Sequence, residues 1–186
     1  MAEDESAARR FAGEVLAVLL PILVLFGALM MLAMPWVLWA FANEDLRGDA
    51  VMFDQAVTMG RIAFPYLMFM SLATLVAAIL NSLSRFAAAA AAPILLNICL
   101  LTALVWGALQ PVGEATRAAT GVGLAIAVSV SGLLQLLWLY WFMRRAGFRI
   151  PRLTPKVTAR VKEMGVLIVP AVFGAGVYQI SRFIDL

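Results

Sequence analysis

The sequence IAFPYLMFMSLATLVAAILNSLS, from Ile62 to Ser84, contains no Asp, Glu, Lys or Arg. The hydrocarbon core of a bilayer is about 30 Å thick and an α-helix rises about 1.5 Å per residue, so roughly 20 apolar residues can cross it. This stretch is long enough to do so. Its length and its lack of charge predict a transmembrane helix.

Stretches of the same kind lie on both sides of this segment, at residues 15–42, 86–113, 118–143 and 164–181. In the whole chain, 64% of the residues are hydrophobic and 13% are charged, and the mean hydropathy is +0.96. A soluble domain averages about 25% charged residues, because its surface must face water. The composition therefore excludes a soluble globular domain.

We expect an all-α fold, a polytopic transmembrane helix bundle of about five helices in a single transmembrane region over residues 1–186. The expected bounds are about 12–42, 62–84, 93–112, 118–143 and 164–186, with a basic loop at 144–163. Pro35 is expected to kink or end the first helix before Trp36. Pro93 disfavours helical geometry at the residue before it, so the alanine run that precedes it is expected to form a short turn.

The basic residues are distributed unequally between the connections. Ten of them lie before the first expected helix, between the second and third, or between the fourth and fifth. Three lie in the other two connections, between the first and second helices and between the third and fourth. Lys and Arg resist translocation, so the side with ten is predicted to be cytoplasmic, with the N-terminus. Basic side chains there are candidates for contact with anionic lipids: Arg144, Arg145, Arg149, Arg152, Lys156 and Arg160.

The sequence offers no catalytic or metal-binding pattern. It contains no histidine and a single cysteine, Cys99, and it has neither a GxSxG motif nor a GxxxxGK[ST] phosphate loop. We therefore expect a protein that is not an enzyme and that uses no cofactor, no metal and no nucleic acid. Its expected surroundings are the lipid bilayer.

Several short motifs resemble those of the bacterial lipid II flippase family (MurJ, formerly MviN), in order and in spacing. They are Arg61-Ile-Ala-Phe-Pro-Tyr-Leu, Ser71-Leu, Ile79-Leu-Asn-Ser82, Arg85-Phe86-Ala, Pro93-Ile-Leu-Leu-Asn97-Ile98, Gly132-Leu-Leu-Gln135-Leu and the closing Pro170 to Ser181. The resemblance covers essentially the whole chain. A transporter of this family, which belongs to the MOP superfamily, has about fourteen helices in two lobes. The resemblance implies that this chain corresponds to its third to sixth helices and the first part of its seventh, so the chain is expected to be part of one lobe.

The resemblance implies export of lipid II, an undecaprenyl-pyrophosphate-linked disaccharide-peptide used for peptidoglycan, across the bacterial inner membrane. The family's cavity arginines lie on its first, second and eighth helices, which this chain lacks. Two alternatives remain open: a polysaccharide or drug exporter of the same superfamily, and a membrane scaffold that transports nothing. The absence of carboxylates from the apolar stretches argues against a cation-coupled drug exporter.

Three polar residues in the best-matching stretch are candidates for the substrate path: Asn81, Arg85 and Asn97. Asn81 and Arg85 are expected four residues apart on one helix, near its cytoplasmic end, where a headgroup would first arrive. The alternative for all three residues is helix packing or capping.

Overall fold

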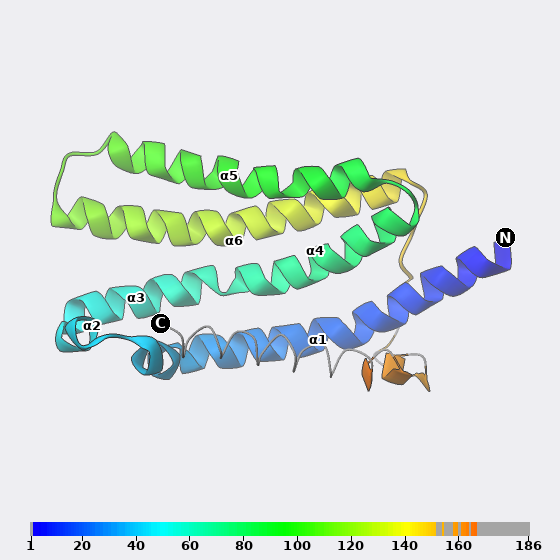
Figure 1. Ribbon diagram of the computed structural model, residues 1–186, viewed down its shortest axis with the longest axis horizontal. Coiled ribbons are helices and arrows are strands. Elements are labelled where there is room, and N and C mark those ends of the chain that lie inside the picture. Colours follow the sequence, from blue (N-terminus) through cyan, green and yellow to red (C-terminus); the bar gives the residue numbers. More distant parts are fainter. Residues whose placement is uncertain (1, 152–153, 155–157, 160, 164, 167–186) are drawn as a thin grey trace, which may run out of the picture. The chain divides into compact units, whose positions relative to one another are not determined.

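A computed structural model describes residues 2–151, 154, 158–159, 161–163 and 165–166. It contains six helices and no strand among these residues (Figure 1): α1 (Ala2–Phe41), α2 (Glu44–Gly48), α3 (Ala50–Ala63), α4 (Pro65–Ser82), α5 (Phe86–Ala108) and α6 (Glu114–Arg145). Four segments are long and apolar enough to cross a membrane: Ser6–Phe41, Ala50–Ser82, Phe86–Ala108 and Glu114–Arg145. The predicted all-α polytopic bundle is confirmed, and the protein is a multi-pass membrane protein. The helix expected at 164–186 lies outside the described residues, apart from residues 165–166.

The chain divides into two compact units, one comprising Met1–Pro21 with Ile150–Leu186 and the other Ile22–Arg149. In the first unit, Glu14 of α1 accepts hydrogen bonds from Arg10 Nε (3.2 Å) and from Thr158 Oγ1 (2.8 Å). Val161 and Val15 are buried in the same unit. Thr158, which follows α6 in the chain, therefore has a specific polar contact with the first half of α1.

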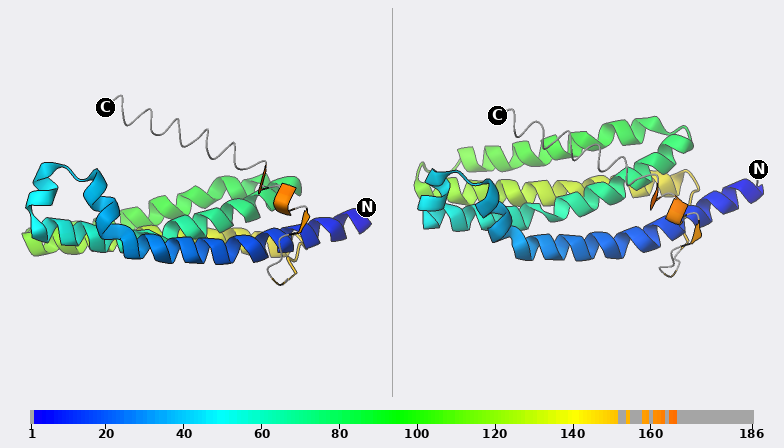
Figure 2. Two further views of the ribbon diagram at one scale, coloured as in Figure 1. Left: turned by 90° about the horizontal axis from the view of Figure 1, so that it is seen from below. Right: turned by 60° about the horizontal axis from the view of Figure 1, so that its bottom comes forward.

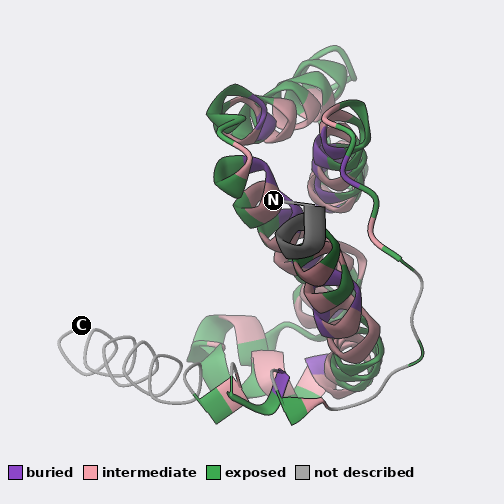
Figure 3. Cartoon of the chain, turned by 90° about the vertical axis from the view of Figure 1, so that its right-hand side faces the viewer, coloured by how far each residue is buried: buried purple, intermediate pink, exposed green. Residues whose placement is uncertain are grey.

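The second unit is built around α6, which packs against α3, α4 and α5. Figures 1 and 2 show α5 and α6 side by side, with α3 and α4 following one another along α6. One stripe of α6 is buried at helical spacing and consists of Ala127, Ser131, Gln135, Leu139 and Met143. Buried positions form narrow strips in Figure 3, and large apolar side chains such as Leu101 and Val105 are exposed. Outward-facing apolar side chains are what a bilayer requires.

The contact between α4 and α6 depends on a glycine. A Cβ atom added at Gly132 would lie 2.8 Å from Tyr66 Cδ2 and 3.2 Å from Phe69 Cβ, so the two backbones approach more closely than a larger residue permits. Ala73, on the same side of α4, is 2% exposed. Small residues at helix contacts are the usual basis of close packing in membranes, where apolar burial drives association weakly.

The structure bears on two expectations about proline. The helix α1 continues through Pro35 to Phe41, so Pro35 does not end the first helix, and the expected kink stays a prediction. The helix α5 begins at Phe86, with Pro93 inside it, so the expected turn at the alanine run is wrong. Alanine has the highest helix propensity, and a proline inside a membrane helix is tolerated where neighbouring groups supply hydrogen bonds to the carbonyls that it leaves free.

The membrane span expected at 62–84 instead covers Ala50–Ser82 and is interrupted. The helix α3 ends at Ala63 and α4 begins at Pro65, so Phe64 alone separates them. Pro65 has no N–H to donate to the carbonyl of Arg61, which explains the interruption. Asp49 caps α3 by accepting hydrogen bonds from the amides of Val51 (3.0 Å) and Met52 (2.9 Å).

Candidate functional site at the ends of α4 and α6

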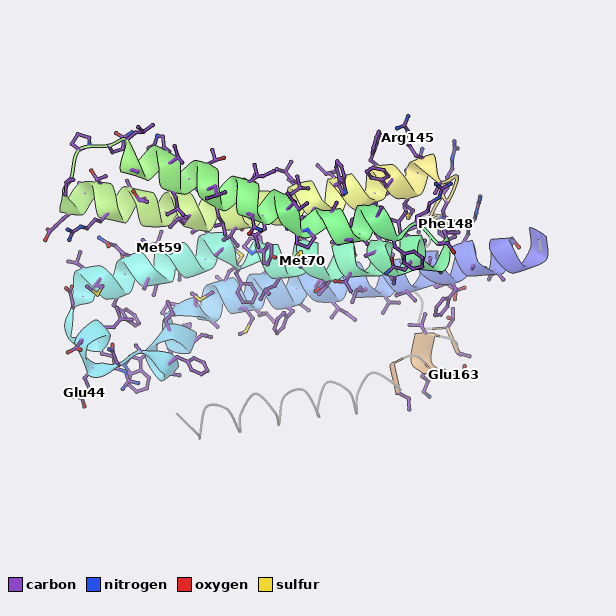
Figure 4. The ribbon with its side chains drawn as sticks, turned by 45° about the horizontal axis from the view of Figure 1, so that its top comes forward. Glu44, Met59, Met70, Arg145, Phe148 and Glu163 are labelled. Atoms are coloured by element: carbon purple, nitrogen blue, oxygen red, sulfur yellow. The ribbon has the colours of Figure 1, made fainter. Side chains whose placement is uncertain are left out.

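The acidic residues in 22–149 lie at only one end of the helices. All five lie in α2, at its edge, in the first two turns of α3 or in the first turn of α6: Glu44, Asp45, Asp49, Asp54 and Glu114. That end also carries Arg47 and Arg117. The opposite end carries Arg85, Arg144, Arg145 and Arg149 and no acidic residue. Figure 4 shows Glu44 and Arg145 at these two ends. We call this group of four arginines the basic end.

The helix α4 ends in a Schellman motif. The amide of Arg85 donates to the carbonyl of Leu80 (2.8 Å), and the amide of Ser84 donates to the carbonyl of Asn81 (3.0 Å). Ser84 has φ of +58°, a left-handed conformation that costs an L-residue about 1–2 kcal/mol. The sharp turn that results leads directly into α5.

The helix α6 ends in the same motif with different residues. The amide of Phe148 donates to the carbonyl of Met143 (3.2 Å), and that of Gly147 donates to the carbonyl of Arg144 (3.1 Å). Here glycine occupies the left-handed position, with φ of +81°. Phe148 and Met143, which this motif brings together, are 5% and 0% exposed. Figure 4 shows Phe148 at the same end of the helices as Arg145.

The structure places one of the three substrate-path candidates, Arg85, differently from its expected position. Asn81 lies exposed in the last turn of α4, as expected, but Arg85 lies in the turn between the helices, at the N-cap of α5. The expectation that both residues share one helix is wrong, because the helix ends at Ser82. Asn97 is exposed on α5, about 16 Å along the helix from Phe86. Asn81 and Arg85 are therefore close neighbours, and Asn97 lies deeper along α5.

Aromatic rings hold the arginines at the end of α6. The guanidinium of Arg145 lies 4.6 Å from the centroid of the Trp141 ring, and that of Arg144 lies 5.9 Å from the Tyr140 ring. Such cation–π contacts keep a charge beside an apolar surface without neutralising it. Of the other predicted lipid contacts, Arg149 is exposed, and Arg152, Lys156 and Arg160 lie outside the described residues.

An apolar groove of about 410 Å³ lies beside these rings, between α5 and α6. Its lining comprises Leu95, Leu134, Leu137, Trp138 and Trp141. The indole of Trp138 is fixed by donating from Nε1 to the carbonyl of Ala88 (3.1 Å). The lining itself is apolar, and the guanidinium of Arg145 lies over the ring of Trp141, one of its residues; this combination suits a lipid with an anionic headgroup. A larger groove nearer the other end of α5, of about 500 Å³, has no charged residue in its lining.

Most polar side chains within the apolar stretches are satisfied locally. Ser71, Thr74 and Thr102 each donate to the carbonyl four residues earlier in the same helix, at 2.8 Å. Gln135 differs, because it is 1% exposed and its Nε2 has no hydrogen-bond partner among the described residues. The sequence included Gln135 in a matching motif but gave no sign that it would be the most deeply buried amide. Its burial comes from the packing around α6.

No group of three or more His, Cys, Asp or Glu residues that could hold a metal ion occurs among the residues that the structure describes. The surface available at the basic end is therefore one of guanidinium, amide and aromatic groups. These groups bind anionic and polar headgroups by charge and hydrogen bonding.

Comparison with known proteins gives a consistent result. The family model described as lipid II flippase MurJ matches residues 1–186. The chain is 38% identical over 184 residues to the probable lipid II flippase MurJ of Rhizobium meliloti (strain 1021), an alignment that covers 99% of this chain and 34% of the relative. It is 39% identical over 178 residues to the corresponding protein of Rhizobium tropici (95% and 33%). It is 36% identical over 162 residues to the lipid II flippase MurJ of Burkholderia cenocepacia (81% and 28%). The chain thus spans about a third of the length of these relatives.

Proposed function

Because this chain belongs to the lipid II flippase MurJ family, we propose that it works as part of a flippase that moves lipid II from the inner to the outer leaflet. The observation that carries the proposal is the match of the family model to every residue from 1 to 186. The multi-pass helical architecture supports it, because moving a lipid headgroup across a bilayer requires a protein that spans the bilayer.

The physical task explains why a helix bundle is needed. The substrate proposed here carries a pyrophosphate and sugars, and transferring such a group into hydrocarbon without compensating contacts costs far more than thermal energy. A bundle that exposes a polar cavity first to one side and then to the other lowers this barrier. The apolar lipid chain can remain in the bilayer while the headgroup crosses.

We propose that the protein lies in the bacterial inner membrane with its N-terminus in the cytoplasm. The charge separation in residues 22–149 supports this orientation, because the end with four arginines and no acidic residue would face the cytoplasm. The basic end is then at the leaflet from which lipid II is taken. This places Asn81 and Arg85 where an anionic headgroup arrives.

Within this proposal, the two sides of the basic end have different tasks. Arg85, with Asn81 beside it, meets the pyrophosphate and sugar groups of the substrate, and Asn97 offers a further amide deeper along α5. The arginines on and after α6 contact anionic membrane lipids, and the apolar groove beside Trp141 accepts an acyl chain. The predicted lipid contacts at Arg152, Lys156 and Arg160 lie outside the described residues and stay predictions.

The test replaces Asn81 in the gene at its own chromosomal locus. N81L removes the amide without adding charge, and we expect slower growth and accumulation of lipid-linked precursor in the inner leaflet. The matched control is Q110L, because Gln110 is an exposed amide in the turn at the other end of α5. Normal growth and normal precursor distribution in N81L would remove Asn81 from the site. Unchanged precursor distribution on depletion of the whole protein would overturn the proposed function.

A further inference from the structure

Three hydrogen bonds in the second unit run from a side chain of one helix to a backbone carbonyl of another. Arg61 Nε donates to Met31 O (3.0 Å), Ser129 Oγ to Ile62 O, and Trp138 Nε1 to Ala88 O (3.1 Å). Each acceptor lies three to five residues before a proline: Pro35, Pro65 and Pro93. Only Met31 lies four residues before its proline, at the carbonyl that loses its helical donor; Ile62 and Ala88 each lie one residue from such a position.

The contact at Pro35 is the most direct of the three. In an α-helix the amide of residue 35 donates to the carbonyl of residue 31, and proline has no such amide. The carbonyl of Met31 therefore lacks its helical donor, and this is the carbonyl to which Arg61 donates. An arginine from α3 thus supplies the hydrogen bond that Pro35 withholds from α1.

The neighbouring contacts lie at the same place on both helices. A Cβ atom added at Gly60 would lie 2.9 Å from Met34 Sδ, so the two helices touch directly beside Arg61. The rings of Phe26 and Phe64 pack with their centroids 6.2 Å apart. Phe64 is also the residue at which α3 gives way to α4. The contact therefore joins the interior proline of α1 to the proline interruption of the next membrane span.

A cation at the end of a membrane-spanning stretch usually extends toward the headgroup region. The structure instead directs the Nε of Arg61 to a backbone atom of another helix, 30 residues away in sequence. A hydrogen bond from a charged donor to a carbonyl without another donor is stronger than one to a carbonyl that already has its helical partner. Its strength should therefore depend on Pro35.

We propose that Arg61 is a positioning residue that fixes residues 22–41 of α1 against α3 by replacing the missing amide of Pro35. We call Arg61, Met31 and Pro35 the polar clasp. It lies next to the break between α3 and α4. Both helices lack a backbone hydrogen bond there, so each can bend at this point while the clasp holds them together. The inference extends to transport only through the proposed function. In that case α1 and the span formed by α3 and α4 move together about the clasp during the transport cycle.

The test measures how readily positions 34 and 60 form a disulfide in membranes. M34C and G60C are introduced into the full chain together with C99S, which removes the one native cysteine. Oxidation rates are compared for Arg61, R61M and R61K, each combined with Pro35 or P35A. R61M keeps the length and apolar stem of the side chain and loses the donor, whereas R61K keeps a charged donor.

We expect R61M to slow disulfide formation about tenfold when Pro35 is present, as the loss of a charge-assisted hydrogen bond predicts. R61K should slow it less. The P35A substitution restores a backbone amide that can donate to the carbonyl of Met31, so in that background R61M should have an effect of about twofold or less. This dependence on position 35 is a result that an arginine acting only through the headgroup region would not produce.

A second cysteine pair reports whether the variants remain folded. A Cβ atom at Gly107 would lie 3.1 Å from Thr120 Cβ, so G107C and T120C join α5 to α6 away from the clasp, and R61M should not change their oxidation rate. Equal slowing by R61M with Pro35 and with P35A, or no slowing with Pro35, would overturn the clasp. The disulfide rates do not involve transport, so they stand even if the proposed function fails.

Discussion

The helices α4 and α6 end with the same hydrogen-bond pattern and use it for different purposes. At the end of α6, glycine adopts the left-handed conformation and the next residue, Phe148, is buried. At the end of α4, serine adopts that conformation and the next residue is the exposed Arg85. One end thus adds apolar burial to the bundle, whereas the other holds a charged side chain at the surface on a strained turn.

We expect this difference to decide which of the two helix ends is available for a ligand. Strained backbone positions persist where the surrounding structure requires them, and they are frequent at functional sites. A turn at Ser84 costs stability that glycine would recover, and it sets the backbone of the exposed Arg85 close after Asn81. Four substitutions test the comparison, from the largest expected change in the free energy of unfolding to the smallest.

Replacing Phe148 by alanine should have the largest effect. The side chain is 5% exposed, so F148A should lower the free energy of unfolding by about 3 kcal/mol through lost burial and the cavity that remains. Thermal denaturation in detergent, followed by circular dichroism, measures the change. Phe86 is 60% exposed and provides the control, because F86A should change the melting temperature little. Similar losses for the two variants would contradict the structural role given to the end of α6.

Replacing Gly147 by alanine should have the next largest effect. At φ of +81° an added Cβ is strained although it meets no atom within 4 Å, so G147A should destabilise the protein by about 1–2 kcal/mol. Gly27 lies inside α1 and also has open space around its Cα, so G27A should stabilise by about 0.5–1 kcal/mol. Changes of the same sign at both glycines would show that the left-handed conformation is not the cause.

Replacing Ser84 by glycine should change stability in the favourable direction. S84G removes the cost of a left-handed Cβ and should raise the free energy of unfolding by about 0.5–1 kcal/mol. The same melting experiment measures it. A lower melting temperature in S84G would mean that the serine hydroxyl contributes more than the backbone strain costs.

Replacing Arg85 by alanine should have the smallest effect on stability and a large effect on function. The side chain is exposed and has no ion pair among the described residues, so R85A should change the free energy of unfolding by less than about 0.5 kcal/mol. Growth that depends on this gene should nevertheless fall in R85A and recover partly in R85K, which retains the charge. Normal growth in R85A would exclude Arg85 from the substrate path.

Much of the fold could be predicted from the sequence, because the relevant forces act over short distances. The lengths of the uncharged stretches predicted the membrane spans, and the distribution of charged residues predicted an end rich in arginine. The position of Arg85 could not be predicted, because the point at which α4 ends depends on the left-handed turn at Ser84. Nor could the helix across Ala87–Pro93, since Trp138, fifty residues later, donates to a carbonyl inside it.

The order of the amino acids was enough to establish a bundle of membrane-spanning helices, because hydrocarbon excludes charges and unpaired backbone groups from any span. Packing in three dimensions settled which carbonyl each side chain would reach. Ser129 and Trp138 of α6 reach Ile62 and Ala88 across the contacts that α6 makes with its neighbours. Arg61 of α3 reaches Met31 of α1 beside the close approach of Met34 to Gly60. Proline leaves a carbonyl free wherever it occurs in a helix, but only packing brings a donor to it.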